Sequence, residues 1–354
     1  MVDTQDVLFD EMPGEDGDLG IITLNRPAVL NSLNHDMIVA MHGKLKEWMP
    51  ADHIKAVVIR AAEGRAFCAG GDLRLTYDRA RHHDPLMTEF FSDEYQLNRC
   101  IHHYPKPYIA LLDGITMGGG VGVSIHGSHR IATERLLFAM PETGIGLFPD
   151  VGGTYFLPRL PGVIGYYLGL TGARLKADDS TALGLTNHKI NHDSIPDLLT
   201  ALAGTKFSGN PHSSVSTMIE KFHVPVAPSG LMEAKSELQS CFSADSIEQV
   251  IERLAGSAHP LCQDALKAMQ KKSPTSLKVT LKALLNGKNM DFDACMRQEF
   301  RLVSRFLLAH DFIEGIRAVI IDKDQSPVWK PATLTAVDNE SIEKYFAPLM
   351  KELA

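Results

Sequence analysis

The chain has 354 residues, of which 44% are hydrophobic and 22% are charged. This composition is typical of a globular protein with enough apolar side chains for a sizeable core. The 35 basic and 43 acidic residues give a formal net charge of −8. An excess of acidic groups argues against binding to nucleic acid or to anionic membranes through general electrostatics. No apolar run approaches the roughly 18 residues of a membrane-spanning helix.

The cysteines and the N-terminus both bear on the compartment. The five cysteines are scattered, and no two form a C-x-x-C pair. This pattern predicts reduced thiols in a cytosol-like compartment, not a disulfide framework. Residues 1–20 carry several acids and no Lys or Arg, which argues against a signal peptide and against a mitochondrial presequence. We therefore expect a cytoplasmic chain.

The first 190 residues alternate between strand-like and helix-like patterns. An amphipathic helix is predicted over residues 37–49, where apolar residues recur at spacings of three and four. Short β-branched or apolar runs predict strands at residues 20–25, 56–60, 108–112, 129–133 and 136–139. Strands that alternate with helices through short connections imply parallel pairing and an α/β core.

After about residue 190 the helical pattern dominates. Ser273 before Pro274 predicts a helix that runs to Gly287, and a long helix is expected at residues 292–308. Asp311 and Glu314 have the spacing of a capping box for the next helix. Residues 210–230 contain three prolines and are predicted to connect the two parts. We expect an α/β core with the active site over residues 1–210 and a mainly helical region over residues 211–354.

Two glycine-rich turns follow predicted strands, at residues 66–72 and 114–122. Glycines in such turns let backbone N–H groups approach a ligand closely. One N–H group from each turn, aimed at one point, would form an oxyanion hole. The alternative is that these glycines only permit tight turns. Cys68 lies inside the first turn and is interpreted as a packing residue.

A third segment, residues 140–154, carries Glu142 and Asp150 in an otherwise nearly uncharged stretch. Carboxylates in apolar loops are costly unless they are paired or used, and burial raises their pKa toward a catalytic range. The alternative is that Asp150 caps a helix starting at Val151 and that Glu142 is a solvated loop residue. The sequence lacks the motifs of a P-loop, of a dinucleotide-binding turn and of an H-E-x-x-H zinc site.

Together these segments resemble the crotonase superfamily of enoyl-CoA hydratases and isomerases. The resemblance rests on Asn25-Arg26-Pro27, on A-F-C-A-G-G-D at residues 66–72 and on M-G-G-G at residues 117–120. Within the superfamily, the segments F-F-S-D-E-Y (90–95), L-F-P-D-V-G (147–152) and I-D-K-D-Q-S-P-V-W-K-P (321–331) resemble the 3-hydroxyisobutyryl-CoA hydrolase branch. The resemblance covers residues 7–345 and implies a crotonase-type ββα spiral core with a C-terminal helical region.

The resemblance also implies a site. Gly71 and Gly119 would donate the oxyanion hydrogen bonds, and Glu142 would be the central catalytic carboxylate. Glu94 and Asp150 would contact the acyl group, with Asp150 also acting in catalysis. The neighbouring residues of the two glycine turns would complete substrate binding, namely Gly70, Asp72 and Gly118. No metal and no organic cofactor is expected, because CoA arrives as part of the substrate.

The implied reaction is hydrolysis of the CoA thioester of 3-hydroxyisobutyryl-CoA, or of 3-hydroxypropionyl-CoA, as in valine breakdown. The alternative is an enoyl-CoA hydratase or isomerase on the same fold. Many hydratases carry a second glutamate where this chain has Gly122, which favours hydrolysis. One branch of the superfamily also binds RNA, but the acidic balance argues against that. An acyl-CoA substrate is therefore expected as partner, with no nucleic acid and no membrane, and a homo-oligomer would be typical of crotonase folds.

Overall fold

The computed structural model describes residues 5–82, 84–207 and 209–353. Residues 1–4, which begin the acidic N-terminal stretch, lie outside the described residues. The described residues contain no helix that is both long and apolar enough to cross a membrane. The chain forms two compact units, which we call unit 1 (residues 1–71, 96–138 and 175–229) and unit 2 (residues 72–95, 139–174 and 230–354). These units differ from the two regions expected from the sequence, 1–210 and 211–354. That division into domains stays a prediction.

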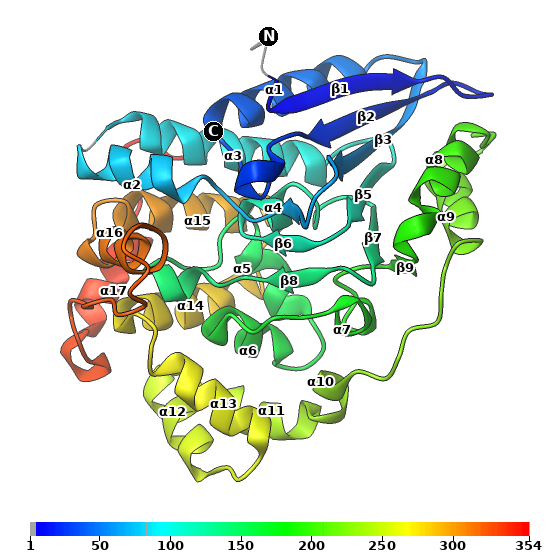
Figure 1. Cartoon of the computed structure of the whole chain (residues 1–354). Helices are drawn as coiled ribbons and strands as arrows, with labels where there is room; N and C mark the ends of the chain where they lie inside the picture. Colours follow the sequence, from blue (N-terminus) through cyan, green and yellow to red (C-terminus); the bar gives the residue numbers. More distant parts are fainter. Residues whose placement is uncertain (1–4, 83, 208, 354) are drawn as a thin grey trace. The chain divides into compact units, whose positions relative to one another are not determined.

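Unit 1 is built on a six-stranded sheet, and its strand order is β1-β2-β3-β5-β7-β9 (Figure 1). The strands are β1 (Val7–Met12), β2 (Asp18–Leu24), β3 (Ile54–Ala61), β5 (Tyr108–Leu112), β7 (His129–Thr133) and β9 (His188–Ile190). β1 is antiparallel to β2, and every later neighbour pair is parallel. The predicted parallel α/β core is therefore confirmed, while β1 and β9 were not predicted.

Helices cover both faces of this sheet. Successive side chains of a strand point to opposite faces, and β2 and β3 are buried almost throughout, so both faces are apolar. One face packs against α8 (Ile195–Ala203) and α9 (Pro211–Glu220), in a cluster that includes Ile21 and Val58. The opposite face meets α1 (His35–Trp48), where a Cβ on Gly20 would lie 2.7 Å from the ring of Trp48. A glycine is thus needed where the helix approaches the sheet most closely.

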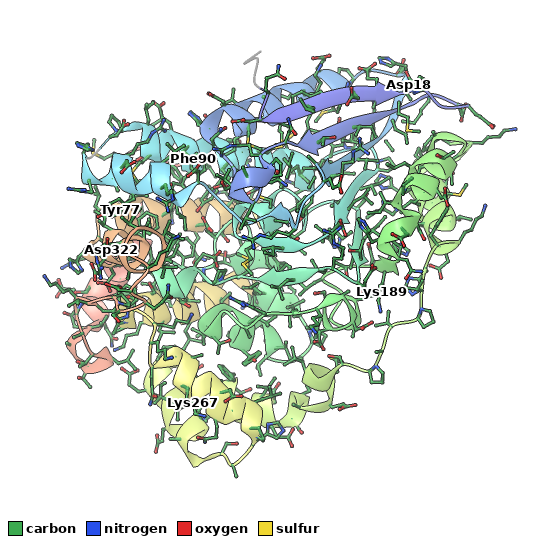
Figure 2. The ribbon with its side chains drawn as sticks, viewed as in Figure 1. Asp18, Tyr77, Phe90, Lys189, Lys267 and Asp322 are labelled. Carbon is green, nitrogen blue, oxygen red and sulfur yellow. The ribbon has the colours of Figure 1, made fainter. Side chains whose placement is uncertain are left out.

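A second, three-stranded sheet of β4 (Ala66–Cys68), β6 (Ile115–Met117) and β8 (Leu137–Ala139) leads into the glycine-rich turns. The turn after β6 opens the short helix α4 (Gly119–Gly122). Elsewhere in unit 1, Lys189 of β9 (labelled in Figure 2) donates to Asp178 of α7 (Ala177–Ala182) at 2.6 Å.

The predicted connection at residues 210–230 is wrong for its first half. Asn210 is the N-cap of α9, and its side chain accepts the N–H of His212. Pro211 then occupies the first helical position, where a proline is tolerated because its missing N–H would have no partner there. Three prolines signalled a connection, but the first of them starts a helix.

Unit 2 is mainly helical, as expected for the C-terminal part of the chain. Its helices are α2 (Leu73–Arg81), the first part of α3 (Leu86–His102), α5 (Gly153–Phe156), α6 (Ile164–Thr171), α10 (Gly230–Glu233), α11 (Lys235–Phe242), α12 (Ile247–Gly256), α13 (Pro260–Met269), α14 (Pro274–Gly287), α15 (Phe292–Phe306), α16 (His310–Ile316) and α17 (Asn339–Phe346). The cap of α14 is confirmed, since the side chain of Ser273 accepts the N–H of Ser276.

The predicted capping box at Asp311 and Glu314 is wrong. α16 begins at His310, and its N-cap residue Ala309 has no side-chain cap. Asp311 is 3% exposed and instead accepts hydrogen bonds from Ser273 Oγ at 2.7 Å and from the backbone N–H of Lys330 at 2.7 Å. A buried carboxylate is stabilised by donors from other segments, and here these outweigh local capping.

Candidate active site

Glu142 is a buried carboxyl group in unit 2. It begins the 3-10 turn η2 (Glu142–Ile145), is 5% exposed, and has no hydrogen-bond partner for Oε2 among the described residues. The reading of Glu142 as a solvated loop residue is therefore wrong. Burial raises its pKa well above the usual range; the negative charges of Asp150 and Glu94 act in the same direction, and Lys272 opposes them. Such a group is a strong base once it is ionised.

Asp150 is 4% exposed and accepts a hydrogen bond from the Tyr95 hydroxyl at 2.8 Å. Burial raises its pKa, and the bond from Tyr95 opposes that effect. The proposed cap on a helix starting at Val151 is wrong, because α5 begins at Gly153 with Gly152 as its N-cap. The side chain of Asp150 is directed to Tyr95, and only its backbone carbonyl accepts the N–H of Gly153, at 2.7 Å.

Glu94 precedes Tyr95 on α3 and is 2% exposed, with no partner for Oε1 among the described residues. Burial and the charge of Asp150 raise its pKa well above the usual range. The structure thus brings together three predicted site residues, Glu94, Glu142 and Asp150, closely enough for each to affect another electrostatically. Because like charges in a dry site oppose one another, these groups titrate as a coupled set.

A fourth buried carboxylate, Glu299 of α15, was missed by sequence reasoning. It is fully buried and accepts the N–H of Gly152 at 2.7 Å and the N–H and Oγ–H of Thr154 at 2.9 and 2.6 Å. Burial raises its pKa to about 8, against the effect of these bonds. A signal existed in the sequence, because Glu299 lies on the apolar stripe of α15 between Met296 and Val303. A lone acid on an apolar helix face predicts a buried partner.

The segment that Glu299 holds has an unusual backbone. Val151 has φ of 49° and Gly152 has φ of 88°, so two consecutive residues are left-handed. This conformation is unfavourable for a β-branched residue and persists only where surrounding contacts enforce it. Three hydrogen bonds from residues 152–154 to one buried carboxylate provide such contacts and fix the backbone that follows Asp150.

The two glycine turns lie side by side in unit 1. Gly70 has φ of 108° and Gly118 has φ of 48°, both left-handed. A Cβ on Gly70 would lie 3.4 Å from the carbonyl oxygen of Met117 and 3.7 Å from the nitrogen of Gly119. Gly119 is the first residue of α4, so its N–H has no intrahelical acceptor. In the turns and caps of the described residues, neither Gly71 nor Gly119 donates its N–H to a backbone carbonyl.

Gly120 and Cys68 explain why the turns can approach. A Cβ on Gly120 would lie 2.3 Å from the carbonyl oxygen of Cys68 and 2.8 Å from its Cβ. Cys68 is fully buried, and its Sγ lies 3.7 Å from the carbonyl oxygen of Gly70. Its surroundings agree with the interpretation of Cys68 as a packing residue.

Asp72 belongs to unit 2, where its side chain caps α2 by accepting the N–H of Leu75 at 3.4 Å. A capping role satisfies this carboxylate without a ligand. Its part in substrate binding stays a prediction.

Two clusters of described residues in unit 1 carry side chains of the kinds that bind metals: the first is His188, Glu220 and His223, and the second is Glu11, Asp18 and His53. In each cluster the ligand atoms lie within 4.8 Å of one another. In the first cluster, His188 Nδ1 has no hydrogen-bond partner among the described residues. Glu220 lies 3.6 Å from His188, and His223 Nδ1 accepts the N–H of Lys189 at 3.3 Å. None of these residues belongs to the predicted site.

Comparisons with known proteins show similarity over nearly the whole chain. A family model described as enoyl-CoA hydratase/isomerase matches residues 19–346. The mitochondrial 3-hydroxyisobutyryl-CoA hydrolase of Rattus norvegicus is 44% identical over 342 residues, covering 94% of this chain and 87% of the relative. The human protein of the same name is 43% identical over 338 residues, with 94% and 87% covered.

Two solved structures share the fold over nearly the whole chain. A carnitinyl-CoA dehydratase from Mycobacterium thermoresistibile has a TM-score of 0.91 at 37% identity, with 99% of both chains covered. An enoyl-CoA hydratase from Rhodobacter sphaeroides 2.4.1 has a TM-score of 0.87 at 37% identity, with 98% of both covered. The predicted crotonase-type fold is confirmed, and the chain belongs to the enoyl-CoA hydratase/isomerase family.

Proposed function

We propose that this chain hydrolyses the thioester of 3-hydroxyisobutyryl-CoA to the free acid and CoA, a step of valine catabolism. Curated relatives that bear the name of this hydrolase match 93–97% of the chain at 42–44% identity. The structural observation that carries the proposal is Glu142, a buried carboxyl group whose Oε2 has no partner among the described residues. Burying such a group without a partner is costly, which is expected where a substrate completes its contacts.

Thioester cleavage requires stabilisation of a negative charge on the carbonyl oxygen. We assign this task to the N–H groups of Gly71 and Gly119, which lie in adjacent turns and donate to no backbone carbonyl there. Each donor of this type typically contributes about 10²–10³ in rate. Backbone donors also need no reorganisation, because the left-handed glycines at 70 and 118 fix their turns.

Glu142 supplies the oxygen chemistry in one of two ways. Its carboxylate attacks the carbonyl carbon to form a mixed anhydride and release the CoA thiolate, or it accepts a proton from a water molecule that attacks. Both routes need the ionised form. Because burial raises the pKa of Glu142, kcat/KM should increase as pH rises through that pKa. Mass spectrometry of the protein after turnover with hydroxylamine distinguishes the routes, because only an anhydride can give a hydroxamate on the Glu142 side chain.

Asp150 and Glu94 are assigned to the acyl group, where a 3-hydroxyl offers both a donor and an acceptor. Asp150 already holds one hydrogen bond from Tyr95, which leaves further lone pairs for a ligand. Glu94 Oε1 has no partner among the described residues. A hydroxyl bound between buried polar groups is recognised strongly, because its removal leaves those groups unpaired.

A hydratase or dehydratase is the second candidate, since the two solved structures with the same fold carry those names. Adding water across a conjugated double bond commonly uses two carboxylates. Gly122, which stands where many hydratases have the second glutamate, is a buried glycine of α4 and offers no acid or base. Hydrolysis needs only one activated oxygen and a thiolate that leaves readily.

The proposal extends to the setting of the reaction. No metal or organic cofactor is needed, since CoA arrives with the substrate. The cytoplasmic location and the homo-oligomer expected from the sequence are part of the proposal. Fractionation of the native host cell and light scattering of the purified chain test these two points.

The test compares two reactions of the purified chain. We expect rapid thiol release from 3-hydroxyisobutyryl-CoA and much slower loss of enoyl absorbance from crotonyl-CoA. Glu142→Gln should reduce kcat at least about 10²-fold, because an amide neither attacks nor accepts a proton. Glu89→Gln, on the exposed face of α3, is the control and should retain activity. Fast hydration of crotonyl-CoA with negligible thiol release would instead establish the hydratase.

A further inference from the structure

Lys272 is a half-buried lysine between α13 and α14 in unit 2. Its ammonium lies beside the turn that carries Glu142. A Cβ on Gly144 would lie 3.0 Å from Lys272 Nζ, and one on Gly172 would lie 3.4 Å from it. Gly172 in turn lies against Pro141, whose Cα is 3.0 Å from the same Cβ position. Two glycines therefore leave room for this ammonium next to residues 141–144.

The segment that carries Lys272 is fixed on several sides. The backbone N–H of Lys272 donates to Met269 at 3.0 Å, and the N–H of Ser273 donates to the carbonyl of Thr143 at 3.3 Å, next to Glu142. Ser273 Oγ also donates to Asp311. These contacts fix the backbone of Lys272 and Ser273. The Lys272 ammonium is thereby kept near the turn that carries Glu142, although the side chain is long.

The C-terminal motif I-D-K-D-Q-S-P-V-W-K-P contributes two of the contacts that hold this segment. Trp329 Nε1 donates to the carbonyl of Lys271 at 3.1 Å, and the N–H of Lys330 donates to Asp311, the acceptor of Ser273. The start of the motif is anchored separately, since Arg317 pairs with Asp322 and Asp324 at 2.7 Å. The C-terminal motif thus helps to position residues 271–273.

The charges around Glu142 are otherwise negative or already paired. Asp150 and Glu94 face it with like charge, and Lys272 is the cation that opposes them. α6, α14 and α16 pack against η2. α6 carries no charged side chain, and the charged groups of the other two helices have partners: Lys278 with Glu248, Lys282 with Glu343, His310 with Asp311, and Glu314 with Arg317. Lys272 has no ion pair of this kind within the described part of the chain.

We propose that Lys272 is a positioning residue for thioester hydrolysis, which keeps Glu142 ionised and available to react. The inference rests on the proposed function, because it takes Glu142 as the reacting carboxylate. The positive charge of Lys272 lowers the pKa of Glu142 against the effect of burial, because an opposite charge near a buried carboxylate favours its ionised form. The hydrolase-type C-terminal motif then has a chemical purpose: it holds this cation beside the base.

The experiment measures kcat/KM for 3-hydroxyisobutyryl-CoA against pH in wild type and Lys272→Met. In Lys272→Met, the acidic limb of the kcat/KM profile should move to higher pH by about one unit. On that limb kcat/KM should be roughly tenfold lower than in wild type, and it should recover at higher pH. Lys272→Arg keeps the charge and should restore the limb. Lys267→Met, an exposed lysine of α13 labelled in Figure 2, should leave the profile unchanged. Lys272→Gln provides a second neutral variant if the methionine variant does not fold.

Two results would overturn the inference. An unchanged acidic limb in folded Lys272→Met or Lys272→Gln would show that the lysine does not act on Glu142. A raised KM for the CoA thioester, with an unchanged limb and normal kinetics on the phosphate-free acyl-pantetheine, would assign Lys272 to a CoA phosphate. Either result leaves the proposed function intact, whereas full activity of Glu142→Gln would remove the proposed function itself.

Discussion

Glu299 accepts both the backbone N–H and the hydroxyl of Thr154, at 2.9 and 2.6 Å, across 145 residues of sequence. The same carboxylate accepts the N–H of Gly152, so it holds the left-handed backbone directly after Asp150. Asp150 is thereby fixed from two directions, by this turn and by the Tyr95 hydroxyl. The orientation of Asp150, which we assign to the acyl group of the substrate, therefore depends on a carboxylate from a helix far along the chain.

Glu299→Gln should destabilise the protein by about 1–3 kcal/mol, because an amide cannot accept all three hydrogen bonds and leaves a buried donor unpaired. The kcat should also fall as the turn after Asp150 loosens. Urea unfolding and steady-state kinetics measure the two effects. Glu252→Gln, at an exposed position of α12, is the control and should change neither quantity.

The difference in unfolding free energy between wild type and Glu299→Gln should depend on pH. The folded-state pKa of Glu299 is raised to about 8, so between about pH 4.5 and 8 the folded state binds more protons at this group than the unfolded state. Stability from Glu299 is therefore present below the unfolded pKa and is lost as pH rises toward 8. The deficit in unfolding free energy of Glu299→Gln relative to wild type should narrow over this range. A deficit that widens with pH would contradict a neutral buried Glu299.

Tyr95→Phe removes the donor to Asp150 Oδ2 and leaves the fold of α3 unchanged. The pKa of Asp150, already raised by burial, should rise further because the bond from Tyr95 favours the charged form. We expect a several-fold lower kcat at neutral pH and an acidic limb of kcat shifted to higher pH. Tyr77→Phe on α2 (Figure 2) is the matched control, since that ring lies over Arg81. If the pH profile of kcat is unshifted in folded Tyr95→Phe, the protonation state of Asp150 does not control the rate-limiting step.

Asp150→Ala should impair 3-hydroxyisobutyryl-CoA more than isobutyryl-CoA, which lacks the hydroxyl. A site that bonds a substrate hydroxyl loses this discrimination when its polar partner is removed. The measurement is kcat/KM for thiol release from both substrates. Equal fractional losses would assign Asp150 to orienting Glu142, and not to the hydroxyl.

Gly120→Ala should destabilise the protein by about 1–3 kcal/mol or more and reduce activity, since its Cβ would overlap the carbonyl oxygen of Cys68. The clash is with backbone, so no side-chain movement relieves it. The control is Gly43→Ala in α1, where a Cβ meets nothing within 4 Å. That substitution should stabilise the helix by about 0.5–1 kcal/mol. Thermal unfolding of both variants checks the pair, and wild-type stability of Gly120→Ala would contradict the close approach of the two turns.

Local pattern was sufficient for much of the fold. The strands β5 and β7 lie where apolar and β-branched runs predict them, and α14 begins at Pro274 behind its Ser273 cap. These features depend on interactions within a few residues, so the sequence alone determines them. The glycine turns were recognisable for the same reason, because a left-handed residue such as Gly70 or Gly118 is a local requirement.

Tertiary structure decided which polar groups meet. Asp311 and Asp150 have the spacing of helix caps, but each is buried and satisfied by a donor from a distant segment, Ser273 in one case and Tyr95 in the other. Glu299 was visible in the sequence only as an acid on an apolar helix face, and Lys272 only as one lysine among many. The free energy of a buried charge depends on what surrounds it in space, and residues that lie far apart in the chain provide those surroundings.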